Sequence, residues 1–204
     1  MDGTGRPDDV REVGTLDLEA LGRGESVGLT PTDDALFAVC THGRRDPCCA
    51  ERGRPLASAL SGAFPEEAWE STHIGGDRFA GNMIAFPHGY YFGRLDPVRG
   101  VEVATGYVGG TVDLEHLRGR SCRPTDVQAA EHHLRTRHAL TGIDDVTVVE
   151  VSRAGRETFS TFRTPLGPFR VRILRKLASE ERLTCHSDAR QRPPRFEVVG
   201  VEAG

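Results

Sequence analysis

One stretch of the chain, residues 39–94, constrains the rest because it gathers residue types that bind soft metal ions. It begins with Cys-Thr-His-Gly-Arg-Arg-Asp-Pro-Cys-Cys-Ala at Cys40–Ala50 and continues with Thr-His-Ile-Gly-Gly-Asp at Thr72–Asp77. Three of the five cysteines of the chain lie within it. Thiolates and imidazoles together select zinc or iron–sulfur clusters. The stretch therefore predicts a metal centre built from two loops.

The composition excludes several other classes of protein. With 204 residues the chain is long enough for a domain with a substantial core, and its net charge of −4 argues against non-specific nucleic-acid binding. The polar start of the sequence does not resemble a secretory signal, and no apolar run approaches the ~18 residues that span a bilayer. We therefore expect a cytoplasmic protein with no nucleic-acid or membrane partner. In a reducing compartment, an odd number of cysteines indicates metal or redox chemistry rather than a disulfide framework.

The pattern of apolar residues predicts a mixed α/β or α+β fold. A polar segment with one helical turn at 16–21 comes first. Helices are predicted at 47–60, 111–117 and 124–140 from proline, cap and glycine signals. Strands are predicted at 35–39, 68–73, 82–86, 90–95, 145–151, 157–164, 169–174 and 195–201. The arginine-rich run at 170–176 alternates with apolar residues, which is typical of a half-exposed strand rather than of a nucleic-acid patch.

The motifs of the central stretch resemble those of the sucrase/ferredoxin-like family. The resemblance rests on Cys40–Ala50 and on His-Ile-Gly-Gly-Asp-Arg-Phe-Ala-Gly-Asn at His73–Asn82. Residues 83–95 are similar to the strand-turn-strand that follows the second ligand pair in thioredoxin-like 2Fe–2S ferredoxins. The resemblance implies a thioredoxin-like ferredoxin core at 31–120, a polar arm at 1–30, and a helix plus strand-rich extension at 121–204 packed on the core.

The resemblance also implies a ligand set for a 2Fe–2S cluster. It places Cys40 and Cys49 on one iron and His73 on the other, followed by a second histidine four residues later. This chain has Asp77 at that position, so Asp77 is the predicted fourth ligand, although a carboxylate is a harder ligand than a cluster usually takes. The alternatives for the fourth place are Cys122, Cys185, Cys48, His42 and water.

The function implied by the resemblance is electron transfer rather than enzymatic catalysis. The protein would pass single electrons from a flavin-dependent ferredoxin reductase to an acceptor enzyme, and a homodimer is compatible with this role. One alternative is a thioredoxin-like thiol oxidoreductase that uses Cys40, Cys48 or Cys49, although no Cys-x-x-Cys follows a predicted strand. Another is a structural zinc site with the same four ligands.

Overall fold

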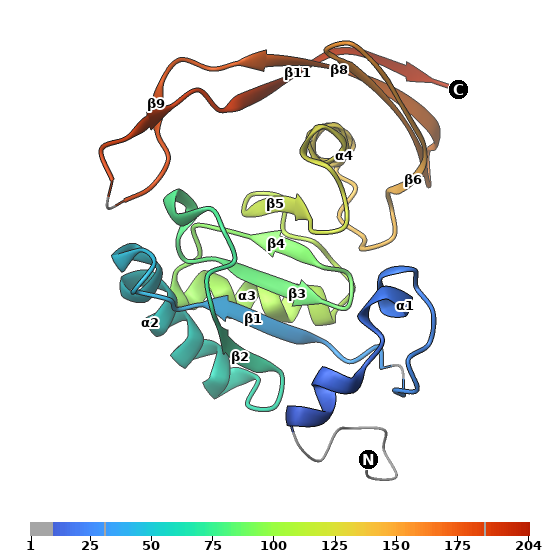
Figure 1. The fold of residues 1–204 in the computed structure, drawn as a ribbon. Coiled ribbons are helices and arrows are strands. Elements are labelled where there is room, and N and C mark those ends of the chain that lie inside the picture. Colours follow the sequence, from blue (N-terminus) through green and yellow to red (C-terminus); the bar gives the residue numbers. More distant parts are fainter. Residues whose placement is uncertain (1–9, 31, 186) are drawn as a thin grey trace. The chain divides into compact units, whose positions relative to one another are not determined.

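The computed structural model describes residues 10–30, 32–185 and 187–204, and the chain divides into two compact units, with the boundary in the sequence between Asp34 and Ala35 (Figure 1). The first unit contains a 3-10 helix, η1 (Val10–Thr15), and the short helix α1 (Leu18–Gly22). The carboxylate of Asp17 caps α1 by accepting hydrogen bonds from the backbone N–H groups of Glu19 and Ala20, at 3.0 and 2.9 Å. The helical turn predicted at 16–21 is thus confirmed.

The second unit begins with a five-stranded mixed sheet in the order β2-β1-β3-β4-β5. Its strands are β1 (Leu36–Cys40), β2 (Ala68–Ser71), β3 (Met83–Phe86), β4 (Tyr90–Phe92) and β5 (Leu117–Arg120). Strand β1 lies between β2 and β3, and it runs parallel to β2 and antiparallel to β3. The four strands predicted between residues 35 and 95 are confirmed with small shifts at their ends.

Two helices share a core with this sheet: α2 (Pro47–Ala63) and α3 (Pro97–Val108). Helix α2 connects the parallel strands β1 and β2, and α3 follows the β3–β4 hairpin. The helices pack against each other, and their buried residues, such as Leu56 and Tyr107, lie in one cluster with Phe37 of β1. A β-α-β half and a β-β-α half are thus combined around one core. The mixed α+β fold class is confirmed.

The helix predicted at 111–117 is wrong. Residues 114–116 form a turn in which the Asp113 carboxylate accepts a hydrogen bond from the His116 N–H at 2.9 Å, and β5 begins directly afterwards. The cap signal of Asp113 therefore serves a turn, as short polar side chains often do.

Helix α3, which lies just before that turn, is not predicted from the sequence. Its Asp96-Pro97 start is a standard cap, and Asp96 accepts a hydrogen bond from the Arg99 N–H at 2.8 Å. Two glycines inside the helix obscure the helical signal. A Cβ atom on Gly100 would lie 2.1 Å from the Leu56 Cδ1 atom, so this glycine lets α2 and α3 approach closely.

The C-terminal part of the chain contains helix α4 (Thr125–His138) and a four-stranded antiparallel sheet in the order β11-β8-β7-β6. The strands are β6 (Thr147–Ala154), β7 (Glu157–Thr164), β8 (Gly167–Leu177) and β11 (Pro194–Ala203). The hairpin of β9 (Glu181–Arg182) and β10 (Arg190–Gln191) lies between β8 and β11 in the sequence. The helix predicted at 124–140 and the four predicted strands are confirmed.

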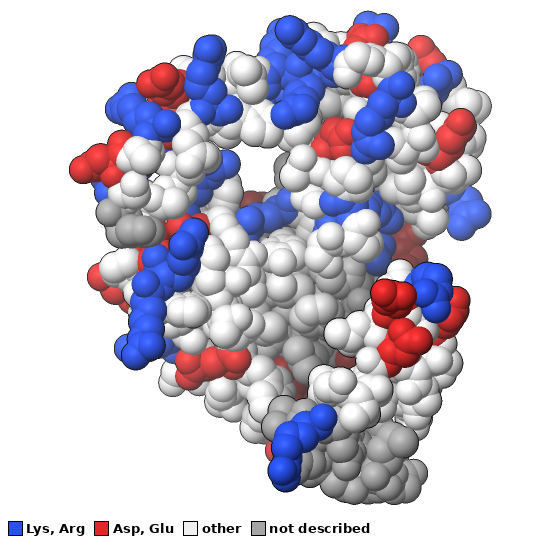
Figure 2. Space-filling model, in the orientation of Figure 1, with Lys and Arg blue, Asp and Glu red and all other residues white. Residues whose placement is uncertain are grey.

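One face of this C-terminal sheet is apolar and the other carries charges. Buried Val171 and Ile173 of β8 share a core with Leu134 of α4, whereas Arg170 and Arg172, which alternate with them along the strand, are exposed. Figure 2 shows Lys and Arg side chains over the upper part of the view, where Figure 1 places this sheet. The half-exposed strand predicted at 170–176 is confirmed.

A buried arginine joins α4 to the first sheet. Arg135 is fully buried and pairs with Glu131 at 3.0 Å. It also donates to the Tyr90 hydroxyl of β4 at 2.7 Å, and that hydroxyl donates to the Ile143 carbonyl at 2.9 Å.

The division into an arm, a core and an extension stays a prediction. No helix within the described part of the chain is long and apolar enough to cross a membrane.

Candidate metal centre

The first loop of the centre connects the end of β1 to the start of α2. Cys40 is the last residue of β1, and its N–H donates to the Asn82 carbonyl at 3.0 Å. Asp46 caps α2 by accepting a hydrogen bond from the Cys48 N–H at 3.3 Å, and Pro47 occupies the first helical position. This cap fixes the first turn of α2, which carries the buried Cys49.

A glycine of α2, Gly53, brings Cys40 and Cys49 together. A Cβ atom on Gly53 would lie 2.0 Å from the Cys40 carbonyl oxygen, which no side chain tolerates. The absent side chain therefore lets α2 pack directly against the end of β1. No sequence signal marks Gly53, because its importance arises only from this contact.

The second loop follows β2, and the side chains of Arg118 and Asn82 hold it in place. Gly75 and Gly76 adopt positive φ angles of 86° and 78°. Arg118 of β5 donates to the Gly75 carbonyl at 3.2 Å and to the Asn82 Oδ1 atom at 2.8 Å, and the Asn82 amide donates to the Gly76 carbonyl at 3.0 Å. Burial lowers the pKa of Arg118. Both side chains are positioning residues that the sequence analysis missed.

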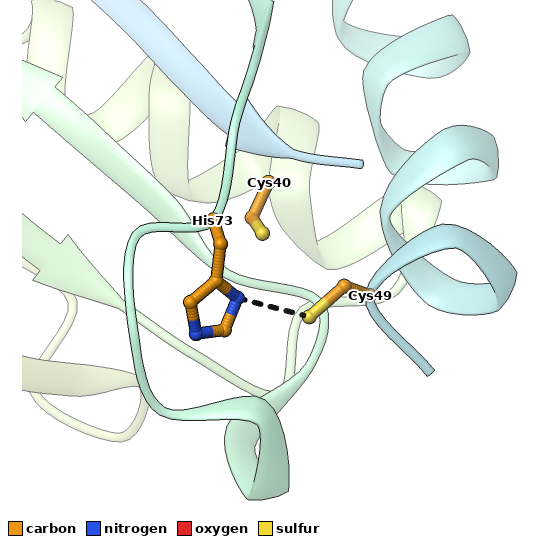
Figure 3. A group of neighbouring side chains, drawn as sticks. All are labelled: Cys40, Cys49 and His73. Atoms are coloured by element: carbon orange, nitrogen blue, oxygen red, sulfur yellow. Dashed lines mark hydrogen bonds between the residues drawn. The ribbon is translucent and has the colours of Figure 1, made fainter. Parts of the chain in front are cut away.

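The two loops bring Cys40, Cys49 and His73 together (Figure 3). One ligand atom from each residue lies within 4.8 Å of the other two. The Cys49 Sγ atom is 3.9 Å from His73 Nδ1. The structure thus groups three of the four predicted ligands, and their binding of a metal ion stays a prediction.

Asp77 contacts the other nitrogen of the same imidazole. Its Oδ1 atom lies 3.0 Å from His73 Nε2, and its side chain is only 7% exposed. A carboxylate in this position favours the tautomer that carries its proton on Nε2, which leaves the Nδ1 lone pair free for a metal ion. Asp77 is therefore next to the group of three rather than part of it. Its role as the fourth ligand stays a prediction.

The Cys49 thiol is protonated at neutral pH when no metal ion is bound. Burial, together with the neighbouring Cys40 thiol, raises the pKa of Cys49 to about 12. A thiol binds a metal ion as the thiolate, so metal binding at this site must release protons. Burying the negative charge of the cysteine thiolates costs free energy, and a bound metal centre with positive charge would compensate for that cost. The site is therefore suited to such an occupant.

A second group of candidate ligands consists of Asp46, Cys48 and Cys185. The sulfur atoms of buried Cys48 and exposed Cys185 are 2.7 Å apart. Burial and the adjacent Cys185 thiol raise the pKa of Cys48. The sequence contains no signal for this pairing because 137 positions separate the two cysteines. Among the residues that the structure describes, His42 and Cys122 belong to neither group.

Three arginines surround Phe79 beside the second loop. The guanidinium carbons of Arg78, Arg94 and Arg118 lie 4.8, 5.0 and 4.9 Å from the centre of its ring. Arg78 and Arg94 are exposed, whereas Arg118 is half-buried. These contacts place a basic surface, which we call the Phe79 arginine cluster, next to Asp77.

Comparisons with known proteins cover mainly the part of the chain that contains these loops. The model of a family described as sucrase/ferredoxin-like matches residues 8–119. "Altered inheritance of mitochondria protein 32" of Meyerozyma guilliermondii is 32% identical over 98 residues, which are 42% of this chain and 34% of that protein. The matched region thus spans about a third of that curated relative. No solved structure gives a significant match.

Proposed function

This chain belongs to the sucrase/ferredoxin-like family, and we propose that it is an electron carrier that holds a 2Fe–2S cluster at Cys40, Cys49 and His73. The convergence of these three side chains from separate elements supports the proposal most strongly. Two thiols and one imidazole are a soft donor set of the kind that iron–sulfur clusters and zinc select. The residues present therefore fit such a group.

The cluster, when bound, would supply a reversible one-electron couple, and histidine ligation raises its potential relative to ligation by four cysteines. The residues of the protein would bind the cluster and orient its ligands. Cys40 and Cys49 are each 1% exposed, which limits access of water and oxidants to their sulfur atoms. Asp77 holds the His73 ring through Nε2 while Nδ1 faces Cys49. The hydrogen bond favours a role for Asp77 as an orienting partner, and an oxygen of the same carboxylate remains the first candidate for the fourth ligand.

The partners in this proposal are a reductase of the ferredoxin-reductase type and an acceptor enzyme. The Phe79 arginine cluster offers an exposed positive surface close to the centre, to which an acidic partner surface would be attracted. Such attraction raises the rate of association and weakens as the salt concentration rises.

The proposal is tested by purification of the protein without oxygen, followed by visible absorption spectroscopy before and after addition of dithionite. We expect a red-brown protein whose visible absorption bleaches on reduction. Colourless protein that contains zinc in place of iron would support a structural zinc site instead. Colourless, metal-free protein with disulfide reductase activity would support a thiol oxidoreductase.

A further inference from the structure

A second pair of cysteines lies beside the proposed metal centre and outside its proposed ligand set of Cys40, Cys49, His73 and Asp77. Cys48 is in the first turn of α2, and Cys185 is in the loop between β9 and β10. Their sulfur atoms are 2.7 Å apart. Cys185 is exposed, so small oxidants in solution reach it, whereas Cys48 is buried behind it.

One buried carboxylate fixes both cysteines. Asp46 is 0% exposed. Its Oδ1 atom accepts a hydrogen bond from the Cys48 N–H at 3.3 Å and lies 3.1 Å from the Cys48 sulfur. Its Oδ2 atom accepts a hydrogen bond from the Cys185 N–H at 3.0 Å. The Arg182 side chain donates to the Thr184 carbonyl at 3.1 Å and also to the Cys185 carbonyl, which holds the loop from its other side.

The distance between the two sulfur atoms favours a covalent bond over a shared metal ion. Two thiolates on one tetrahedral zinc ion, each with a Zn–S bond of about 2.3 Å, are roughly 3.8 Å apart. A disulfide bond is about 2.05 Å long. The observed 2.7 Å is closer to the disulfide than to the zinc geometry.

We propose that Cys48 and Cys185 form a reversible disulfide that ties the β9–β10 loop to the start of α2. A low-molecular-weight disulfide such as oxidised glutathione is the oxidant. The exposed Cys185 sulfur attacks it to form a mixed disulfide and releases one glutathione. The Cys48 sulfur then attacks the Cys185 sulfur and releases the second glutathione. The two thiol protons leave with the two glutathione molecules, so two electrons pass from the protein to the oxidant.

The position of this bond couples it to the neighbouring centre. Cys48 adjoins Cys49 in the sequence, and its sulfur lies 3.4 Å from the Asp77 carbonyl oxygen. Oxidation therefore fixes the β9–β10 loop against both loops that carry the proposed ligands, and reduction releases it. The bond forms from residues outside the proposed ligand set, so it does not depend on the presence of a cluster.

The test is tryptic mapping of the full-length protein after incubation with oxidised glutathione and alkylation of the remaining free thiols. Cleavage after arginine yields a peptide of residues 46–52, which contains Cys48, and one of residues 183–190, which contains Cys185. We expect these two peptides to be joined and to separate after dithiothreitol treatment. Fragmentation between Cys48 and Cys49 should place the bond on Cys48. The result should be the same in anaerobically purified and chelator-treated protein.

Matched variants complete the test. Cys48→Ser and Cys185→Ser should each abolish the joined peptide, whereas Cys122→Ser, a change at another exposed cysteine, should leave it intact. Three outcomes would overturn the proposal: alkylation of Cys185 as complete as that of Cys122, a joined peptide that uses Cys49, or protection of both thiols only while a chelatable metal ion is bound.

Discussion

His73 and Asp77 are joined by a contact of 3.0 Å between Nε2 of the imidazole and Oδ1 of the carboxylate, while Nδ1 of the same ring faces Cys49. Histidines that bind metal ions almost always donate their second ring N–H to a carboxylate, a carbonyl or water. The pair therefore has the form of a ligand and its orienting partner.

Asp77→Asn and Asp77→Ala should differ in iron retention if Asp77 orients His73. An asparagine oxygen can still accept the Nε2 proton, so Asp77→Asn should retain iron almost as well as the original protein. Asp77→Ala removes the acceptor and should weaken metal affinity by about 10- to 100-fold, as loss of such a partner usually does. Competition with an iron chelator measures the metal affinity of both variants. Equal, severe loss in the two variants would instead identify the carboxylate as a ligand.

Gly53→Ala should damage the centre from a position that contacts no metal ion. The added Cβ would lie 2.0 Å from the Cys40 carbonyl, so α2 must move away from β1. We expect a loss of about 1–3 kcal/mol in the free energy of unfolding, measured by urea denaturation, and a lower iron content. Gly62→Ala is the matched control in the same helix, because a Cβ there meets no atom within 4 Å. Equal effects of the two substitutions would refute the close-packing role of Gly53.

Arg118→Met should loosen the loop that presents His73. It removes hydrogen bonds to the Gly75 carbonyl and to Asn82, and each buried group left without a partner costs about 1–3 kcal/mol. Iron content should fall with stability. Arg94→Met is the control, since Arg94 also stacks on Phe79 but is exposed, and its loss should cost only about 0.5–1 kcal/mol. Unchanged stability and iron content in Arg118→Met would contradict the positioning role.

Arg135→Met should destabilise the fold without acting on the centre directly. It leaves the buried Glu131 charge with one partner fewer and removes the hydrogen bond to Tyr90. Breaking a buried pair from one side costs about 3–5 kcal/mol. Arg137→Met, on the exposed side of α4, should change the free energy of unfolding by less than about 0.5 kcal/mol. Similar denaturation midpoints for the two variants would show that the contacts of Arg135 with Glu131 and Tyr90 contribute little to the free energy of unfolding.

Local signals in the sequence predicted most strands and helix α4, because alternating apolar residues and helix caps act over a few neighbouring positions. The same signals failed at α3, where Gly100 serves a contact with Leu56 of another helix. They also failed at 111–117, where Asp113 caps a turn instead of a helix.

The ligand candidates were accessible from the sequence because the motif places them in two short loops. The residues that position these ligands could not be predicted from the sequence. They are Gly53, Asn82 and Arg118, which act through backbone atoms or through contacts with residues distant in sequence, and no spacing rule describes such contacts. The approach of Cys185 to Cys48 likewise arises only in the folded chain, where the loop between β9 and β10 lies beside the start of α2.

The central claim is that Cys40, Cys49 and His73 hold a 2Fe–2S cluster, and the most direct measurement is iron and acid-labile sulfide per chain after anaerobic reconstitution. We predict about two irons and two sulfides per chain, as the cluster composition requires. Cys40→Ser and Cys49→Ser should lose both, and Cys122→Ser should retain both. Protein that retains neither iron nor sulfide, or Cys40→Ser and Cys49→Ser variants that retain both in full, would contradict the account.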